Sequence, residues 1–479
     1  MAAASPYLRQ ERPGNYTWVL VALGLLGVAV ASGVSLAYGE LQAFYAAISV
    51  ALCLAIFADF RIGVVALIVT LPLHSTTLFP RGMMGITGLN PANLLLAATL
   101  ASYLLRGRLE EIAKLVRPQL VWLCVVPIAI AGAFGAFHAE DVVPIFYERE
   151  LVNFIGPLGY IRDLLLRPML LVVLALLLGA AAARAQKPER FLVPIAISVW
   201  IMALVMIVYV IQSGMSLGQL SRATERGFFE PLGFHSNGVG RLLAAVYALL
   251  LFPWWETKKA GLKLFLFLTM GVLSFALLLT FSRGAFTGFI LVNLLFLAWK
   301  FNLRTLLLAI AAVTVLVIFT PGYVVGRVTV GFGTGEADHL TAGRTDGIWM
   351  PLLPELAKSP VWGNGLGSTM WLDPQQRGAM LPVTHPHNAY LEALLDMGVI
   401  GLGLLLAFFW HVWRGFRALG SSPWLGPEMR AFFQGAAAAL ACFMVTGMAG
   451  SSLRPDPDFS YLWLAIGLMY GMKARKPTD

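Results

Sequence analysis

Apolar runs of about twenty residues recur along almost the whole chain, and this feature constrains the fold more than any other. Roughly 20 helical residues cross a bilayer core, and helices satisfy their backbone hydrogen bonds internally, as a bilayer requires. The alternation of a membrane β-barrel is absent. Only 12% of the residues are charged and 58% are hydrophobic, whereas soluble domains carry roughly 25% charged residues. We therefore predict an all-α, polytopic transmembrane helical bundle.

We expect 12–14 spans in a single integral membrane domain over residues 1–479, with short helices in a large loop region on one face. The runs at 62–78 and 92–105 are the weakest, and they account for the lower number. A polar start followed by an apolar run favours a retained first helix over a cleaved signal peptide. The candidate spans are roughly 17–37, 41–58, 62–78, 92–105, 119–136, 169–185, 190–212, 239–254, 262–280, 284–299, 303–320, 388–413, 431–448 and 459–472.

The basic residues predict the orientation. If both termini are cytoplasmic, 21 of the 34 lysines and arginines fall on the cytoplasmic side and 13 on the other, as the positive-inside rule favours. The cytoplasmic side holds eight lysines, but the opposite side holds only Lys358. Arginine binds phosphate in a bidentate way, so an arginine face suits an anionic ligand. Alternatively, each arginine only reaches toward lipid headgroups.

Three segments interrupt the spans on this arginine-rich face. Residues 137–168 are amphipathic and could lie along the membrane interface. Residues 213–238 form a loop that carries Arg222, Arg226, His235 and Asn237. Residues 321–387 form the largest loop, which is rich in glycine and proline. Connections this long are usually functional, so we expect the last segment to be the catalytic loop.

The sequence TFSRGAF places Arg283 where one span ends on the outer side and the next begins. An arginine at this depth needs an anion, carbonyl groups or water, and Ser282 adds a hydroxyl donor. The alternative is an ordinary turn whose arginine contacts lipid headgroups. Farther along, Arg344 opens a helix with Thr345 and Asp346 in its first turn, unless it only pairs with that aspartate. The sequence GNGLGS that follows would let backbone approach a ligand closely.

The sequence HPHNAYLEALLDMGVIG begins at His385 and holds two histidines at the start of a long apolar helix. A neutral imidazole can take a proton from a hydroxyl, so His387 is a candidate general base. Asn388 could orient it or bind substrate hydroxyls, and His385 could contact substrate. Glu392 and Asp396 do not share the i+4 face of His387. A purely structural role is commoner for a single histidine than for such a pair.

Metal ligation has little support in the sequence. It contains no HExxH or DxD motif, and the three cysteines form no CxxC pair. We predict no metal and no cofactor, because arginines can stabilise an anionic group without a metal.

The pattern His-Asn, nine residues, Gly, two residues, Gly resembles the signature of the O-antigen ligase and polymerase superfamily. With SRGA and the GR-opening loop segment, the resemblance covers roughly residues 215–470, and the earlier part matches only as a helical bundle. It implies a bacterial inner-membrane glycosyltransferase with a periplasmic active site. The donor would be an undecaprenyl-diphosphate-linked O-polysaccharide and the acceptor lipid A-core, with inversion at the anomeric carbon and no metal or nucleotide.

The resemblance gives residues their roles. His387 would activate the acceptor hydroxyl, and Arg283 and Arg344 would hold the donor diphosphate. We expect further substrate contacts from Asn388, His385, Ser282, Arg222, Arg162 and Arg241.

Other functions stay open. O-antigen polymerases and protein O-oligosaccharyltransferases carry similar motifs, although the chain shows no large soluble C-terminal domain of the kind expected in the latter. A carrier or flippase for lipid-linked sugars could use the same arginines, but it would be expected to show internal repeats, and none is evident. Partners outside the membrane and its glycolipids, nucleic acid included, are not predicted.

Overall fold

The predicted all-α class is confirmed in the computed structural model, apart from a hairpin of two-residue strands, β1 (Gly82–Met83) and β2 (Ile86–Thr87). The expected first span, 17–37, lies outside the described residues. The structure describes residues 41–74, 76, 82–83, 86–106, 113–222, 227–319, 322, 325–326, 338, 341–450 and 452–475.

Helices form wherever a span was expected from residue 41 onward. In chain order, the long ones are α2 (Leu41–Ala58), α3 (Phe60–Thr70), α4 (Pro91–Arg106), the stretch from α6 (Pro118–Leu120) to α7 (Val126–Ala136), the stretch from α9 (Gly156–Tyr160) to α10 (Arg167–Arg184), α11 (Leu192–Ser213), α13 (Ser236–Glu256), α14 (Ala260–Leu279), α15 (Arg283–Trp299), α16 (Leu303–Phe319), α21 (Ala389–Gly420), α22 (Pro427–Thr446) and α23 (Ser460–Arg475). Shorter ones are α8 (Ile145–Glu148), α12 (Leu217–Leu220), α19 (Met350–Leu352) and α20 (Asp373–Gln376).

Seven helices in the described part of the chain are long and apolar enough to cross a membrane. Four more apolar helices fall short of that length, including Arg283–Trp299. The multi-pass membrane character is thus supported, while the number of 12–14 spans stays a prediction.

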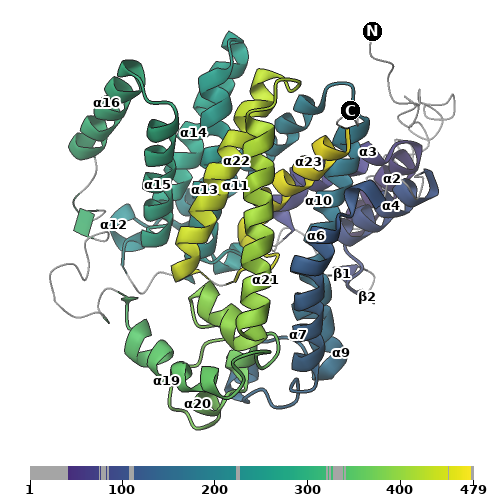
Figure 1. Ribbon diagram of the computed structural model, residues 1–479, viewed down its shortest axis with the longest axis vertical. Helices are drawn as coiled ribbons and strands as arrows, with labels where there is room; N and C mark the ends of the chain where they lie inside the picture. The colour runs from purple at the N-terminus through teal and green to yellow at the C-terminus, as the bar shows by residue number, and fades with distance from the viewer. Residues whose placement is uncertain are drawn as a thin grey trace.

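Helix α13 forms the centre of the bundle. Of its most apolar stretch, 83% is buried, against 39% for the neighbouring α14. It packs against α22, α15 and α14, which Figure 1 shows around it. Gly435 of α22 allows close approach, because a Cβ there would overlap the carbonyl oxygen of Ala248 on α13. Because α13 is surrounded by other helices and not by lipid, its mean hydropathy can be the lowest of these seven helices.

A second close contact joins helices far apart in the sequence, α10 and α23. Gly179, Gly467 and Gly471 lie at their crossing, and a Cβ at each of these glycines would overlap backbone of the opposite helix. Small residues at such crossings let membrane helices pack backbone to backbone. This contact fixes the C-terminal helix beside α10 (Figure 1).

The described residues of the three segments that were expected on the arginine-rich face are partly helical. In the first, α8 precedes a helix that begins at Gly156, so 156–168 continues into α10 instead of remaining separate. The second contains α12 and ends at the start of α13. The third, from residue 341, contains α19 and α20, which lie at the lower end of Figure 1 near the start of α21.

Candidate functional site

Asn388 is the N-cap of α21. Its side-chain oxygen accepts hydrogen bonds from the backbone N–H groups of Tyr390, at 3.1 Å, and Leu391, at 3.2 Å. An asparagine in this position satisfies N–H groups that have no partner within the helix. The cap fixes where the helix begins, and it sets the position of the histidine that precedes it.

His387 has a left-handed backbone, with φ of 53°. Its N–H donates to Nδ1 of His385 at 3.3 Å, and the two rings meet nearly edge-on with centroids 4.2 Å apart. Trp349 holds the peptide between them, because its indole N–H donates to the Pro386 carbonyl at 2.8 Å. A positive φ is strained for a non-glycine residue, and such strain clusters at functional sites.

Both imidazoles are neutral at ordinary pH. Burial is the main cause that lowers the pKa of His387, followed by the neighbouring His385 and Arg344. Burial also lowers the pKa of His385, with Arg241 as the next cause. A neutral ring carries a free lone pair, so it can accept a proton.

A pocket of about 180 Å³ opens beside His387. Arg344, His235 and Asn237 contribute polar groups to its wall, and its apolar side comes from Ile348, Leu381 and Val383. Two of the three residues predicted to be catalytic, His387 and Arg344, thus meet in one cavity.

His235 and Asn237 were noticed in the sequence but given no role. His235 is the N-cap of α13, and its Nδ1 accepts a hydrogen bond from the Asn237 N–H at 3.3 Å. A histidine with an asparagine two residues later, at the mouth of an apolar helix, echoes the His385 motif. That similarity is the signal that could have marked them.

Arg344 is the N-cap residue of a helical stretch that begins at Thr345. Asp346 lies in its first turn, as expected, and its N–H bonds to the side chain of Asp338 at 3.0 Å. Ala342 and Gly343 both have positive φ, so a tight turn presents Arg344 to the pocket.

Arg241 lies in the second turn of α13 and is only 4% exposed. It donates to the Ala449 carbonyl at 3.0 Å and to Asp458 at 3.2 Å. Burial and the nearby Asp456 raise the pKa of Asp458, and Arg241 opposes that change. Arg241 therefore holds the segment before α23 against α13, while its Nε atom has no hydrogen-bond partner.

Ser282 is the N-cap of α15, with its hydroxyl oxygen accepting from the Ala285 N–H at 3.3 Å. A Cβ at Gly240 would lie 3.2 Å from the Cβ of Ser282, so the start of α15 is next to Arg241. Arg283 begins α15 and is half-buried. It is at the same end of the bundle as the pocket but is not among the residues that line it.

Two other predicted contacts lie apart from the pocket wall. Arg162 is exposed and forms a two-bond pair with Asp163, at 2.8 and 2.9 Å. Arg222 is exposed just after α12, and Arg226 lies outside the described residues.

The glycine-rich sequence GNGLGS packs against α21. Asp396 of α21 accepts hydrogen bonds from the N–H of Gly367 at 2.9 Å and from the N–H and hydroxyl of Ser368 at 3.0 and 2.8 Å. Gly363 and Gly365 have positive φ, and a Cβ at either would overlap neighbouring backbone. These glycines bring the loop of residues 341–387 against the bundle, which is a structural role, and the expected approach to a ligand stays a prediction.

A buried ion pair joins α21 to the segment before α23. Glu392 and Arg454 are 2.9 Å apart, and Arg454 also donates from Nε to the Ser452 hydroxyl at 3.1 Å. One atom of each charged group, Oε2 of Glu392 and Nη1 of Arg454, is buried without a hydrogen-bond partner. As expected, Glu392 is engaged elsewhere than with His387.

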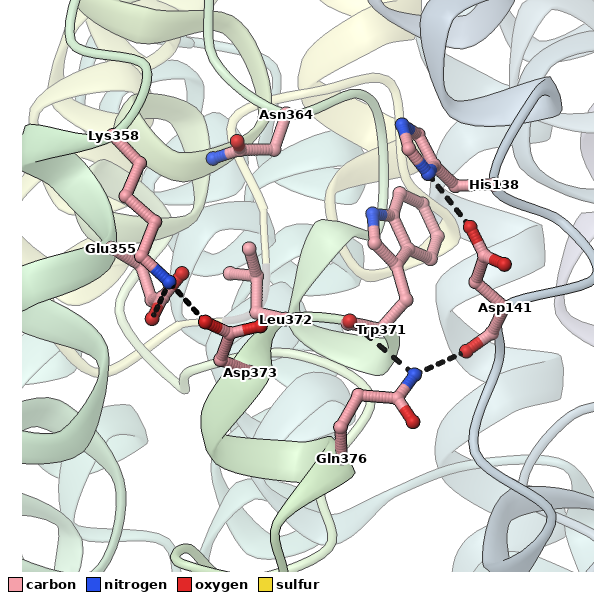
Figure 2. Close-up of a pocket in the computed structure, with 9 residues that line it drawn as sticks. All are labelled: His138, Asp141, Glu355, Lys358, Asn364, Trp371, Leu372, Asp373 and Gln376. Carbon is pink, nitrogen blue, oxygen red and sulfur yellow. Dashed lines mark hydrogen bonds and ion pairs between the residues drawn. The ribbon is translucent and has the colours of Figure 1, made fainter.

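A larger cavity of about 480 Å³ is also built partly from the loop of residues 341–387 (Figure 2). Its walls include the stacked rings of His138 and Trp371, whose centroids are 5.7 Å apart. Within the described part of the chain, no three His, Cys, Asp or Glu side chains gather as a group that could hold a metal ion.

Fold and site together define a polytopic helical membrane protein with a cationic, histidine-bearing pocket among helix N-termini. Residues 265–406 match the family model described as O-antigen ligase, which supports the O-antigen ligase superfamily for this chain. That segment contains Arg283, Arg344 and His387. At the level of the superfamily, the match implies glycosyltransferase-like activity on lipid-linked polysaccharide. No curated protein shows a significant match to the chain.

Proposed function

We propose that this protein is an O-antigen ligase of the bacterial inner membrane. It transfers a glycan from undecaprenyl diphosphate to a sugar hydroxyl of lipid A-core on the periplasmic face, with inversion and without a metal. The observation that carries the proposal is the pocket in which neutral His387 and cationic Arg344, from different elements, face one cavity.

The proton chemistry follows from that pairing. The acceptor hydroxyl oxygen attacks the anomeric carbon while His387 takes its proton, and the bond from that carbon to the diphosphate oxygen breaks. The leaving diphosphate keeps the electron pair, and Arg344 and Arg283 offset its charge. Attack opposite the leaving group inverts the anomeric centre.

Donor binding also prepares the base. Arg344 and Arg241 help to keep the pKa of His387 low in the free protein. A bound diphosphate offsets these positive charges, so the imidazole becomes a stronger base when the substrate is present. His387 is therefore a stronger base when the donor is bound than when the pocket is empty.

The helix ends add to anion binding. The pocket wall includes residues at the start of α13 and of the stretch from Thr345, and His387 immediately precedes Asn388, the N-cap of α21. Helix N-termini carry partial positive charge and unpaired N–H groups, which favour phosphate. A donor linked to its lipid through a diphosphate therefore fits this arrangement better than a donor without charge.

Reconstitution of the purified protein with undecaprenyl-diphosphate glycan and lipid A-core tests the proposal. Glycosylated lipid A-core and free undecaprenyl diphosphate should appear together, in excess EDTA and without ATP. Activity that is lost in EDTA and returns with Mg²⁺ or Mn²⁺ would overturn the arginine mechanism.

The same assay separates the alternatives. A ladder of lengthening glycan still on its lipid carrier would identify a polymerase, and sugar on a protein acceptor would identify a protein O-oligosaccharyltransferase. Intact lipid-linked glycan that crosses the bilayer without release of diphosphate would identify a carrier.

A further inference from the structure

The cavity of about 480 Å³ and the catalytic pocket share one loop, residues 341–387. The helical stretch from Thr345 gives Ile348 to the catalytic pocket and Glu355 to the larger cavity. Seven helical residues cover roughly 10 Å, so a chain of sugars that begins in one could reach the other.

Two adjacent glutamines, Gln375 and Gln376, connect the walls of the two cavities. Gln375 donates to the carbonyls of Leu381 and Val383, at 3.1 and 3.3 Å, and both of these residues line the catalytic pocket. Gln376 lines the larger cavity and donates to the Asp141 carbonyl at 2.7 Å. The backbone at residues 375–376 therefore lies between the two.

The walls of the larger cavity suit a hydroxyl-rich ligand. Figure 2 shows the amide side chains of Asn364 and Gln376, the His138–Trp371 stack and three carboxylates around one space. Amides both donate and accept, and carboxylates accept from hydroxyl groups. Its volume is within the usual range for small-molecule sites, and mixed aromatic and polar walls are what such sites use for orientation.

Charge narrows the choice of ligand. The lining carries three carboxylates, Asp141, Glu355 and Asp373, against one ammonium group, Lys358. Lys358 is paired with Glu355, at 2.9 Å, and with Asp373, and Arg377 outside the lining also pairs with Asp373 at 3.2 Å, so one carboxylate remains in excess. An excess of carboxylate repels phosphate and acidic sugars, whereas the pocket beside His387, whose lining contains Arg344 and no carboxylate, attracts them.

We infer that the larger cavity is a subsite for uncharged sugar units of the donor glycan, on the side of the reacting bond away from the diphosphate. This inference rests on the proposed function. It assigns the phosphate-bearing ends of the substrates to the catalytic pocket and the neutral glycan chain to the space of Figure 2.

Binding tests the subsite without any transfer reaction. The probes are a neutral, lipid-free O-glycan oligosaccharide and a phosphorylated core oligosaccharide, with the full-length protein in nanodiscs. Wild type should bind the neutral probe more tightly. The double variant His138→Ala, Gln376→Ala removes one ring and one amide that are both partly exposed, and it should weaken that binding about tenfold.

Glu140→Gln is the matched control, because Glu140 is exposed beside Asp141 but does not line the cavity. Asp141→Asn removes a negative charge, so it should narrow the difference in affinity between the neutral and the phosphorylated probe. Preference of wild type for that probe, or binding by the double variant equal to that of Glu140→Gln, would overturn the subsite.

Transfer kinetics separate the subsite from the proposed function. With a long-glycan donor the double variant should show a higher KM and a nearly unchanged kcat, and with a single-repeat donor it should match wild type. Loss of neutral-glycan binding in the double variant, in a protein that transfers nothing, would leave the subsite standing and remove the ligase proposal. Transfer with equal KM for both donor lengths would remove the subsite alone.

Discussion

The backbone N–H of His387 donates to Nδ1 of His385 across 3.3 Å, and this bond stabilises the left-handed turn immediately before α21. The acceptor role of His385 Nδ1 means that this nitrogen carries no proton. One histidine thus shapes the turn, and the other presents its ring to the pocket. The two should respond differently to substitution.

Replacing His387 with alanine should abolish most glycan transfer while the protein still inserts and binds donor. Loss of a general base typically costs about 10²–10⁴ in rate. His385→Ala should be milder, because it weakens the turn and leaves the base. Rates from the reconstituted assay check both, and wild-type-like transfer by well-folded His387→Ala protein would exclude the base role.

Arg283→Lys and Arg344→Lys should each lose most activity, because an ammonium group keeps the charge but lacks the two-pronged geometry that binds phosphate oxygens. Arg149→Lys is the control, since Arg149 is exposed at the end of α8 and away from the pocket wall. Donor KM and kcat are the measurements. Normal turnover by both variants would mean that positive charge alone suffices.

The pH profile should reveal the low pKa of His387. Burial and positive neighbours lower it in the free protein, so the neutral, active form persists below the ordinary value of about 6.5. The acid limb of the kcat/KM profile should therefore lie below pH 6.5. The acid limb of the kcat profile should lie at a higher pH than that of kcat/KM, because bound diphosphate raises the pKa of His387. Profiles that share one limb at or above pH 6.5 would contradict this electrostatic picture.

Asp396→Ala should loosen the catalytic loop. It removes three hydrogen bonds to a buried carboxylate, each worth roughly 1.5–3 kcal/mol, although their losses do not add simply. The expected results are a lower Tm in detergent and faster proteolysis between residues 341 and 387, with Glu148→Gln as an exposed control. Unchanged proteolysis would show that other contacts are enough to hold the loop.

The predicted topology can be tested with Ala379→Cys and Ser421→Cys. Both positions are exposed, and Cys124 and Cys442 are buried. An impermeant thiol reagent should label position 379 in intact cells with a permeabilised outer membrane, and position 421 only after lysis of the inner membrane. The reverse pattern would place the pocket on the cytoplasmic side.

Helix positions could be predicted well because a lipid-facing surface leaves a long apolar run in the sequence. The run at 41–58 and the helix α2 have the same bounds. The helix from Gly156 was partly missed, since its first turns carry Arg162 and Asp163 and read as an interfacial segment. Charged residues in the first turns lower the local hydropathy, so an argument from apolar runs places the start of such a helix too late.

The site was only partly predictable. His387 could be singled out because a polar group beside an apolar run is costly without a function. Arg344 could be singled out because it opens a helix within the largest loop. The roles of Asp396 and Gly398 could not, because they depend on a loop about thirty residues away in the sequence. Likewise, the contact of Arg241 with Asp458 joins residues 217 positions apart.

Gly398 interrupts α21 with φ of 62°, and its neighbour Val399 donates its N–H to the carbonyl of Pro360 in the catalytic loop, at 2.9 Å. The number of residues from His387 to Gly398 therefore sets the distance between the proposed base and the kink, where the loop segment at Pro360 crosses α21. One residue inserted between them would turn His387 by about 100° about the helix axis relative to that joint. The number of residues in the motif is therefore constrained as strictly as the side chains within it that make specific contacts, such as Asp396.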